Sequence, residues 1–284
     1  MIDITLNQIF NAKMSDSEFD KLSTFIFDQA GIKMPKVKKV MLQSRLQKRL
    51  RKLEITSFDA YIEYLFSEKG QKEEIIHMLD VVSTNKTDFF REPVHFDFLK
   101  DQVLPEFIKK QNLDNIKIWS AGCSSGEEPY TVAMVLEEFS NEINSINYSL
   151  TGTDISSQIL QKAALAVYKE ERITNIPLEI KRKYFLRSKD RNKKTVRIIK
   201  KLRDKVKYKR LNFMADVYNL NKEFDVIFCR NVLIYFNRET QEKVINKLCL
   251  KLKRNGYLFI GHSESIMGMD VPLKQIKPTI FKRI

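Results

Sequence analysis

The sequence has little glycine and proline, with 8 glycines and 7 prolines among 284 residues. Disordered segments and strand-rich sandwiches use these residues heavily, so their scarcity argues against both classes. No run of 18 apolar residues occurs, and no charged segment followed by an apolar one opens the chain. We therefore expect a cytoplasmic protein with neither a membrane span nor a signal peptide.

Cysteine is rare as well. The three cysteines, Cys123, Cys229 and Cys249, lie far apart, and no Cys-x-x-Cys pair occurs. An odd number of separated cysteines indicates neither a disulfide framework nor a zinc site. We expect reduced thiols in or near the core, and the sequence points to no metal site.

Acidic groups are outnumbered, with 50 Lys and Arg against 36 Asp and Glu, a net charge of +14. Two segments hold the excess. Residues 36–52 have eight basic groups and no acid, and residues 181–210 have sixteen basic groups against two acids. We expect a negatively charged partner that meets both segments, and nucleic acid, anionic lipid and an acidic protein all stay open at this point.

The apolar spacing of residues 1–82 is that of helices alone. Ser15 and Glu18 form a capping-box pattern ahead of a helix from about residue 16 to 30. A second helix, from about residue 37 to 53, has its leucines on one face. We predict an all-helical N-terminal domain over this segment.

Further along the chain, short apolar runs alternate with helical patterns. Such alternation implies right-handed crossovers and a mostly parallel sheet, so we predict a Rossmann-like α/β domain over residues 83–284. Asn255-Gly256 has the pattern of a helix stop before a strand, and residues 272–284 suit one or two closing strands. The runs expected to form the main strands are IKIWSA (116–121), YSLTGTD (148–154), FDVIFC (224–229) and YLFIGH (257–262).

A long basic insertion, at about residues 168–207, separates two of these strands. TVRII (195–199) has the pattern of a strand, and YFLR (184–187) could pair with it across a polar loop. We predict a small antiparallel β-subdomain at the edge of the main fold. The alternative is a solvated surface insert without function, because charged runs are often only solvated.

WSAGCSSGEEPY (119–130) predicts a strand end, a tight loop of small residues and a helix start. Such loops often cradle phosphate at the helix N-terminus, but Glu127 and Glu128 would repel a pyrophosphate. Asp154, 28 residues after Gly126, ends the next strand, where an acid typically accepts ribose hydroxyls. A ligand with a ribose, a cationic end and no phosphate fits these residues, and S-adenosylmethionine is such a ligand.

Each of these polar positions also has a purely structural interpretation. Glu127 and Glu128 suit a first helical turn because of the helix dipole, and Asp154 could cap the helix that follows. Arg230 and Asn231 end the FDVIFC strand in the ligand-facing row, where ordinary loop polar groups also lie. The loop, its acids and the spaced Asp154 together favour a nucleoside cofactor.

Four motifs of the chain coincide with those of one family: STNKTDFFREP (83–93), WSAGCSSGEEPY (119–130), FDVIFCRNVLIYF (224–236) and GHSES (261–265). They strongly resemble the chemotaxis receptor methyltransferases. These are cytosolic bacterial enzymes that use S-adenosylmethionine to methylate glutamate side chains of chemoreceptors, with S-adenosylhomocysteine as the product. The resemblance covers nearly the whole chain, and the run FCRNVLIYF is far more specific than any glycine loop.

The resemblance implies which residues contact the cofactor. Asp154 matches the ribose acid, and Asn212 and Phe213 match the region around the adenine. Tyr235 matches a tyrosine close to the transferred methyl, whereas Ser120 stands where an acid often precedes such loops. The implied cofactor contacts are Asn85, Thr87, Arg91, Glu128, Asp154, Asn212, Phe213, Arg230 and Asn231.

The reaction that the resemblance implies is in-line displacement by a carboxylate. A glutamate is ionised near neutral pH, since its reference pKa is about 4.3, so no general base is needed. The chain has only 3 histidines and no sign of a triad, and we expect these histidines to be structural. We expect Arg91, which orients the acceptor carboxylate or the cofactor, and Tyr235, which lines the methyl, to be catalytic.

The resemblance also gives the basic segments a use. Its substrate is the cytoplasmic helical bundle of a chemoreceptor, and the family's second helix is implicated in recognising methylation sites. In some members the β-subdomain binds a tether peptide at the receptor C-terminus by adding an edge strand. We expect a monomer without a nucleic-acid partner. The substrate-binding residues expected on the exposed side of the second helix are Arg45, Lys48, Arg49 and Arg51.

Two other functions stay open at this point. The net charge of +14 would suit a nucleic-acid methyltransferase, which needs aromatic platforms among its basic runs. The second basic segment offers only Tyr184, Phe185 and Tyr208. The other candidate is a non-catalytic adaptor that senses S-adenosylmethionine and docks on receptors, against which Arg91 and Tyr235 argue.

Overall fold

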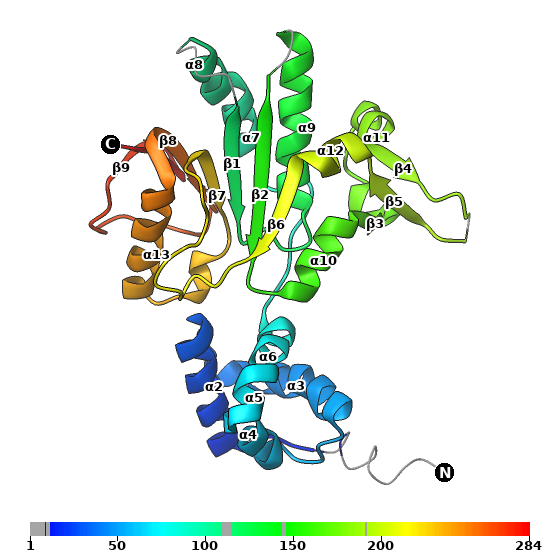
Figure 1. Cartoon of the computed structure of the whole chain (residues 1–284), viewed down its shortest axis with the longest axis vertical. Coiled ribbons are helices and arrows are strands. Elements are labelled where there is room, and N and C mark those ends of the chain that lie inside the picture. The colour runs from blue at the N-terminus through cyan, green and yellow to red at the C-terminus, as the bar shows by residue number, and fades with distance from the viewer. Residues whose placement is uncertain (1–8, 10–11, 110–114, 144–145, 191) are drawn as a thin grey trace.

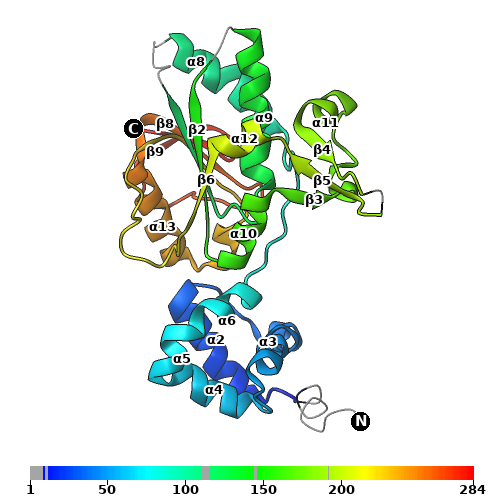
Figure 2. The same ribbon diagram turned by 45° about the vertical axis from the view of Figure 1, so that its right-hand side comes forward.

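The structure, a computed structural model, describes residues 9, 12–109, 115–143, 146–190 and 192–284. It has a helical part at one end and a part built around a β-sheet at the other (Figures 1 and 2). The helical part consists of α2 (Asp16–Ala30), the 3-10 turn η1 (Lys36–Lys38), α3 (Lys39–Leu53), α4 (Phe58–Phe66), α5 (Glu68–Glu73) and α6 (Ile75–Val82).

Local signals place the helices of this first part. Ser15 and Glu18 exchange the two hydrogen bonds of a capping box at the start of α2. Gly31 ends α2 in the left-handed conformation, with φ 69°. The leucine face of α3 is buried in a core shared with α2, α4 and α6. The two helices predicted from sequence are therefore confirmed.

A seven-stranded sheet forms the centre of the second part, in the order β6-β2-β1-β7-β8-β10-β9. Strand β10 runs antiparallel to both neighbours, and the strands from β6 to β8 are parallel. The strand order reverses between β1 and β7, which is where such sheets bind ligands. The strands are β1 (Ile116–Ala121), β2 (Tyr148–Asp154), β6 (Val206–Arg210), β7 (Phe224–Cys229), β8 (Leu252–Ile260), β9 (Leu273–Lys277) and β10 (Ile280–Arg283).

Helices cover both faces of this sheet (Figure 1). Phe228 of β7 belongs to the core on the α9 side, and Ile227 to the core on the α13 side. Every residue of β7 is buried, which explains its near-continuous apolar run. The helical elements around the sheet are α7 (Val94–Phe98), the π-helical η2 (Leu99–Val103), α8 (Leu104–Lys109), α9 (Glu127–Glu142), α10 (Ser157–Leu165), η4 (Leu233–Tyr235) and α13 (Arg238–Lys251).

The helix stop predicted at Asn255-Gly256 is wrong. Helix α13 ends at Lys251, and β8 already begins at Leu252, so both residues lie within the strand. Asn255 has φ 63° there, and the pairing register between β7 and β8 shifts nearby. A positive φ is equally usual at a helix end and at a bulge, so the dipeptide alone did not distinguish them.

The basic insertion forms a separate three-stranded sheet with the order β3-β5-β4. The predicted antiparallel pairing is confirmed, with Phe185 opposite Ile198 and Arg187 opposite Val196. The sequence analysis did not identify β3, which is only three residues long. The elements of the insertion are β3 (Val167–Lys169), η3 (Glu170–Ile173), α11 (Leu178–Tyr184), β4 (Phe185–Arg187), β5 (Thr195–Ile198) and α12 (Lys200–Lys205).

Two expectations from composition concern the molecule as a whole. Cys123, Cys229 and Cys249 are free and buried, as expected, and burial raises the pKa of all three thiols. Within the described ranges, no helix combines the length and apolar character needed to cross a membrane.

Candidate active site

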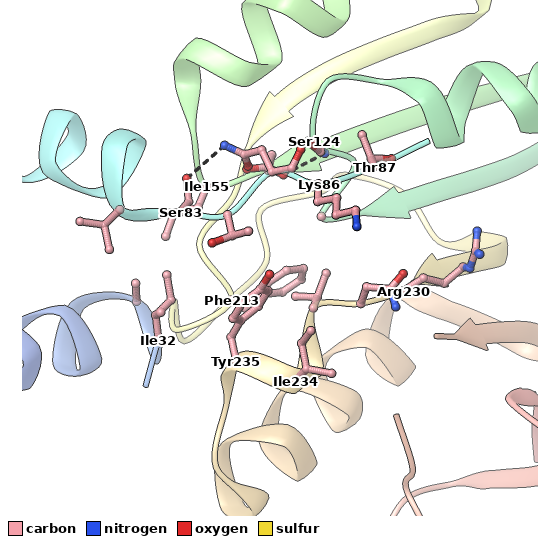
Figure 3. Close-up of a pocket in the computed structure, with 18 of the residues that line it drawn as sticks. Ile32, Ser83, Lys86, Thr87, Ser124, Ile155, Phe213, Arg230, Ile234 and Tyr235 are labelled. Atoms are coloured by element: carbon pink, nitrogen blue, oxygen red, sulfur yellow. Dashed lines mark hydrogen bonds between the residues drawn. The ribbon is translucent and has the colours of Figure 1, made fainter. Parts of the chain in front are cut away.

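One cavity of about 270 Å³ lies between the helical part and the ends of β1, β2 and β7 (Figure 3). Every residue that the sequence analysis assigned to the cofactor or to catalysis lines it. These residues are Asn85, Thr87, Arg91, Glu128, Asp154, Asn212, Phe213, Arg230, Asn231 and Tyr235.

The glycine loop after β1 approaches the loop after β7 closely. Gly122 has φ 82°, and a Cβ atom at this position would lie 2.4 Å from Cγ2 of Val232. Gly126, with φ 94°, is the N-cap of α9. Only glycine adopts these conformations without strain, and at Gly122 only glycine leaves room for the neighbouring loop.

The two acids after the loop turn in different directions. Glu127 accepts a hydrogen bond from Ser125 and lies 2.7 Å from Nη2 of Arg172 in the inserted subdomain. Glu128 lines the cavity, where it accepts a bond of 2.6 Å from the Ser120 hydroxyl. Glu127 therefore anchors the insertion, and Glu128 alone faces a ligand.

Arg230 lies between two carboxylates. Its Nη1 is 3.0 Å from Oε2 of Glu128, and its Nη2 is 3.0 Å from Oε2 of Glu92. Burial raises the pKa of Glu128, although Arg230 and Ser120 oppose this. Burial also acts to raise the pKa of Glu92, but the charge and hydrogen bond of Arg230 lower it overall. Burial and the Arg230 charge together lower the pKa of His95 to about 4.

Asp154 ends β2 with its carboxylate bound to backbone amides. Oδ2 accepts from Ser124 N at 2.9 Å, and Oδ1 from Ser156 N at 3.0 Å. Burial raises the pKa of Asp154, and the hydrogen bonds from the backbone amides oppose this rise. A carboxylate has about four acceptor positions, so Asp154 can also accept a hydroxyl from a ligand. The structural and the ligand-binding interpretations of this residue are thus compatible.

The loop after β6 connects the cavity to the helical part. Asn212 donates from Nδ2 to the carbonyl of Gln29 at 2.7 Å and accepts from Met214 N at Oδ1. Phe213 is buried in the core on the α13 side, with its ring centroid 6.3 Å from that of Phe236. Asn212 therefore positions this loop, and Phe213 offers the cavity an aromatic wall.

Glu264 supports the cavity wall, a role that the sequence analysis did not identify. Its buried carboxylate accepts bonds of 2.5–2.9 Å from the backbone amides of Gly261, Asn231, Val232 and Leu233. Burial raises its pKa, and these four bonds oppose the rise. They hold Asn231 in a left-handed conformation, φ 60°, at the cavity wall. The only sequence signal was its place in GHSES.

The segment between the two parts is fixed by hydrogen bonds along one side of the cavity. Ser124 Oγ donates to the carbonyl of Asn85 at 3.0 Å, and Arg91 Nη1 donates to that of Lys86 at 3.2 Å. Arg45 of α3 donates to the carbonyls of Val82 and Ser83 and to the Thr84 hydroxyl. Arg45 thus orders the segment that carries Asn85 and Arg91.

The exposed position expected for Arg49 is wrong. Arg49 is 4% exposed, and its guanidinium makes a bidentate pair with Glu74, the residue just before α6, at 2.8 and 2.6 Å. Lys48, its neighbour in the helix, is exposed, and Arg51 is half-buried. Position on the helical wheel did not predict this burial because the acidic partner lies 25 residues away.

The helical part also lines the cavity, which no sequence signal indicated. Ile32, Met34 and Lys38 belong to its wall, and Lys33 N donates to the carbonyl of Tyr235 at 3.0 Å. Figure 3 shows Lys86 and Ser124 on one side of the cavity and Tyr235 on the other. A ligand there touches both parts of the molecule.

Fold and site together define a class of enzyme. The parallel sheet with one reversed strand has a glycine loop after β1 and an acid at the end of β2. The adjoining cavity presents the acids Glu128 and Asp154, which suit a cationic group and ribose hydroxyls. The protein is an S-adenosylmethionine-dependent methyltransferase.

The chain matches two family descriptions over nearly its whole length. Residues 85–281 match "CheR methyltransferase, SAM binding domain", and residues 17–83 match "CheR methyltransferase, all-alpha domain". The chain therefore belongs to the CheR methyltransferase family.

Curated relatives agree with this assignment. The chemotaxis protein methyltransferase of Borreliella burgdorferi is 40% identical over 278 residues, which covers 96% of each chain. That of Escherichia coli is 34% identical, covering 90% of this chain and 87% of the relative. A solved structure, magnesium protoporphyrin IX methyltransferase from Synechocystis PCC 6803 with bound SAM, is 15% identical, with a TM-score of 0.31 over 71% of this chain and 74% of that one.

Proposed function

We propose that the protein transfers a methyl group from S-adenosylmethionine to glutamate side chains of a chemoreceptor in chemotactic adaptation. The products are glutamate methyl esters and S-adenosylhomocysteine. The observation that carries this proposal is the single cavity lined by all ten residues that match the family's cofactor and catalytic positions. Relatives named chemotaxis protein methyltransferases support the receptor as substrate.

In this proposal, different residues of the cavity contact different parts of the cofactor. Asp154 accepts the ribose hydroxyls, and the ring of Phe213 lies against the adenine. Glu128 faces the cationic amino acid end, with Arg230 holding its carboxylate in place. Asn85, Thr87, Asn212 and Asn231 complete the contacts.

The chain's own residues need only bind, orient and exclude water. When bound, S-adenosylmethionine supplies an electrophilic methyl on its sulfonium. A receptor glutamate is ionised near neutral pH, so no side chain of this protein has to remove a proton. Arg91 orients the acceptor carboxylate, and Tyr235 lines the position of the methyl.

The test is transfer of labelled methyl from S-adenosylmethionine to a chemoreceptor cytoplasmic fragment, followed by mild base. Carboxyl methyl esters release volatile methanol under these conditions, whereas N-methyl groups and methylated bases do not. We expect base-labile label on the receptor. Label that resists base, or none despite cofactor binding, contradicts the proposal.

Two variants test the catalytic roles. Arg91→Ala and Tyr235→Phe should lower turnover of the receptor fragment while the protein still unfolds at the wild-type temperature. The one hydrogen bond that the Arg91 side chain makes with the described residues goes to a carbonyl of its own segment. Unchanged rates in both variants would remove these roles.

The partner-binding surfaces follow from the same proposal. The helical part, residues 1–82, recognises the receptor's helical bundle through Arg45, Lys48 and Arg51, and residues 83–284 carry out the transfer. Edge strand β4 of the inserted sheet, which pairs with β5 on one side only, accepts a receptor C-terminal tether peptide. We propose that the protein acts as a cytoplasmic monomer and binds no nucleic acid.

Three measurements test these surfaces. A peptide copied from the receptor C-terminus should shift NMR signals of β4 and β5 and leave those of α3 unchanged. Light scattering should give the mass of one chain, 33.5 kDa. DNA added to the transfer assay should acquire no label, whereas methylated DNA would contradict the exclusion of nucleic acid.

A further inference from the structure

A second cluster of titratable side chains lies where the start of α7 meets the loop after β8. It consists of Glu92, His95 and His262, whose donor atoms all lie within 4.8 Å of one another. Oε2 of Glu92 is 3.6 Å from Nδ1 of His95 and 3.8 Å from Nε2 of His262. The proposed methyl transfer gives the two histidines no task.

The hydroxyl of Thr279 contacts the far ring nitrogen of His95 and orients the ring. Thr279 donates its one proton to the carbonyl of Pro278, 2.6 Å from Oγ1. The same Oγ1 lies 2.8 Å from Nε2 of His95. When the hydroxyl accepts in this second bond, Nε2 carries the hydrogen. In that tautomer Nδ1 of the neutral ring offers a lone pair, as a metal-ligating histidine does.

That nitrogen is buried next to a carboxylate. His95 is 1% exposed, and among the described residues its Nδ1 has no hydrogen-bond partner. The charged group that it faces is the Glu92 carboxylate, which is also an acceptor. A metal ion between the Nδ1 lone pair and this carboxylate would bond to both.

The three donors have the composition and spacing of a metal site. Two imidazoles and one carboxylate, with a position left open, are typical of zinc. Zinc bonds of about 2.0–2.2 Å place neighbouring tetrahedral ligands about 3.3 Å apart, close to the 3.6 and 3.8 Å found here. His262 is 55% exposed and can approach further. The Thr279 bond to the far nitrogen of His95 is the orienting contact that ligating histidines have.

We propose that Glu92, His95 and His262 bind a divalent transition-metal ion, with Zn²⁺ the best match. A solvent-accessible hollow lined by both histidines, Asp97 and Lys277 gives the ion a route in. Mg²⁺ prefers oxygen ligands alone and should not bind here. The three cysteines are buried, so no thiolate competes for the ion.

The ion would act on the cofactor cavity through Arg230. The Glu92 oxygen nearest the histidines is also 3.0 Å from Nη2 of Arg230, whose Nη1 contacts Glu128 in the cavity wall. A bound dication draws the Glu92 carboxylate toward itself and leaves Arg230 to neutralise Glu128 more completely. The cavity becomes less favourable for a cationic ligand, so zinc and S-adenosylmethionine weaken each other's binding. The nearby guanidinium in turn keeps the zinc affinity moderate.

Calorimetric titration of the tag-free full-length protein with ZnCl₂ tests the site. We expect one zinc per chain with a Kd in the micromolar range, and no binding of Mg²⁺. His262→Ala should weaken zinc binding by about tenfold or more, and thermal unfolding checks that this exposed substitution preserves the fold. His77→Ala, which removes the remaining histidine, in α6, should leave zinc binding unchanged. No zinc binding, or equal binding by the His262→Ala protein, would overturn the proposal.

A second titration tests the coupling. The Kd of S-adenosylmethionine, measured with and without saturating zinc, should rise about fivefold or more when zinc is present. In His262→Ala, zinc should leave that Kd unchanged. An equal Kd for the wild-type protein with and without bound zinc would contradict the coupling through Arg230.

Discussion

At the scale of single residues, buried carboxyls control the cavity. Glu128 and Asp154 face it, and burial raises the pKa of both. A small set of donors opposes this rise: Ser120 and Arg230 for Glu128, and backbone amides for Asp154. Cofactor affinity therefore depends on pH through these two residues.

We predict that cofactor affinity falls on acidification while the fold stays intact. The loss should begin above pH 4.5, the ordinary pKa of a glutamate side chain, and approach about tenfold for each pH unit below the pKa of the carboxyl concerned. Calorimetric titration with S-adenosylmethionine between pH 8 and about pH 5 measures it. Glu128→Gln should bind weakly at high pH and show a flatter profile. An identical profile in this variant would exclude Glu128 as a titrating contact.

For Glu128 and Asp154, folding stability changes with pH in the opposite direction to cofactor affinity. A carboxyl whose pKa is raised in the folded state stabilises the fold below the unfolded pKa, and this contribution is lost as pH rises. Acid therefore removes no stability through Glu128 or Asp154. Glu92, with its lowered pKa, contributes stability above pH 4.5 that is lost only as pH falls through its folded pKa.

A second prediction at this scale concerns Glu264. Glu264→Gln replaces one acceptor oxygen with a donor facing backbone amides, so we expect a loss of about 1–3 kcal/mol in unfolding free energy. Because Asn231 moves with its loop, the Kd of the cofactor should also rise. Asp225→Asn is the matched control, since Asp225 is a buried carboxylate bound to Lys117 N and Lys253 at the other end of β7. The Asp225→Asn variant should lose stability and bind the cofactor with an unchanged Kd.

At the scale of elements, α3 has two tasks on adjacent residues. Arg49 pairs with buried Glu74, which also accepts from the Tyr61 hydroxyl at 2.9 Å, and so attaches α3 to α4 and α6. Lys48 is exposed and available to a partner. Neighbouring basic residues of one amphipathic helix thus differ in function.

Arg49→Met should destabilise the fold by about 3–5 kcal/mol, because it leaves the Glu74 charge buried without a partner. Denaturant unfolding measures this change. Adding Glu74→Gln removes the uncompensated charge and should recover part of the loss. A single variant as stable as wild type would show that the pair does not hold the helices together.

Lys48→Glu should leave stability unchanged and lower kcat/KM for the receptor fragment, since charge complementarity acts chiefly on association. The effect should shrink at high ionic strength, where exposed charges are screened. Lys52→Glu reverses another exposed charge in the same helix. Comparing the two variants shows whether kcat/KM depends on the position of the charge or on the net charge. Equal methylation by Lys48→Glu and wild type at low salt would contradict a role for Lys48 in recognition.

At the scale of the whole molecule, the cavity depends on how the helical part sits against the sheet. Gly31, at the end of α2, lies close to two loops of the sheet part. A Cβ atom on Gly31 would be 2.7 Å from Phe236 and 2.8 Å from Met214. The carbonyl of Tyr235 accepts from Lys33 N in the same contact. The docking of the two parts therefore sets the shape of the site.

Gly31→Ala should push the helical part away and weaken cofactor binding. Gly268→Ala is the matched control, because Gly268 has a similar φ, 72° against 69°, but its Cβ would meet nothing closer than 3.8 Å. Both variants should lose about 1–2 kcal/mol from the left-handed backbone, and only Gly31→Ala should also raise the Kd of S-adenosylmethionine. Equal affinities in the two would show that docking does not shape the site.

Much of the site is determined by sequence because it lies at strand ends. An apolar run precedes the glycine loop, another leads to Asp154, and a third precedes Asn231. Parallel strands bring their carboxyl ends to one edge of the sheet. Placing the runs was therefore enough to bring these residues together. The capping box of α2 was equally readable, since its two hydrogen bonds join residues three positions apart.

The tertiary structure alone decided the contacts between distant elements. Periodicity reports which face of a helix is apolar, but not which element covers it. Three examples are the burial of Arg49 by Glu74, the cavity wall supplied by Met34 and the meeting of His95 with His262. All three depend on how elements distant in the sequence pack together. Such contacts are set by packing over the whole chain, so no local pattern encodes them.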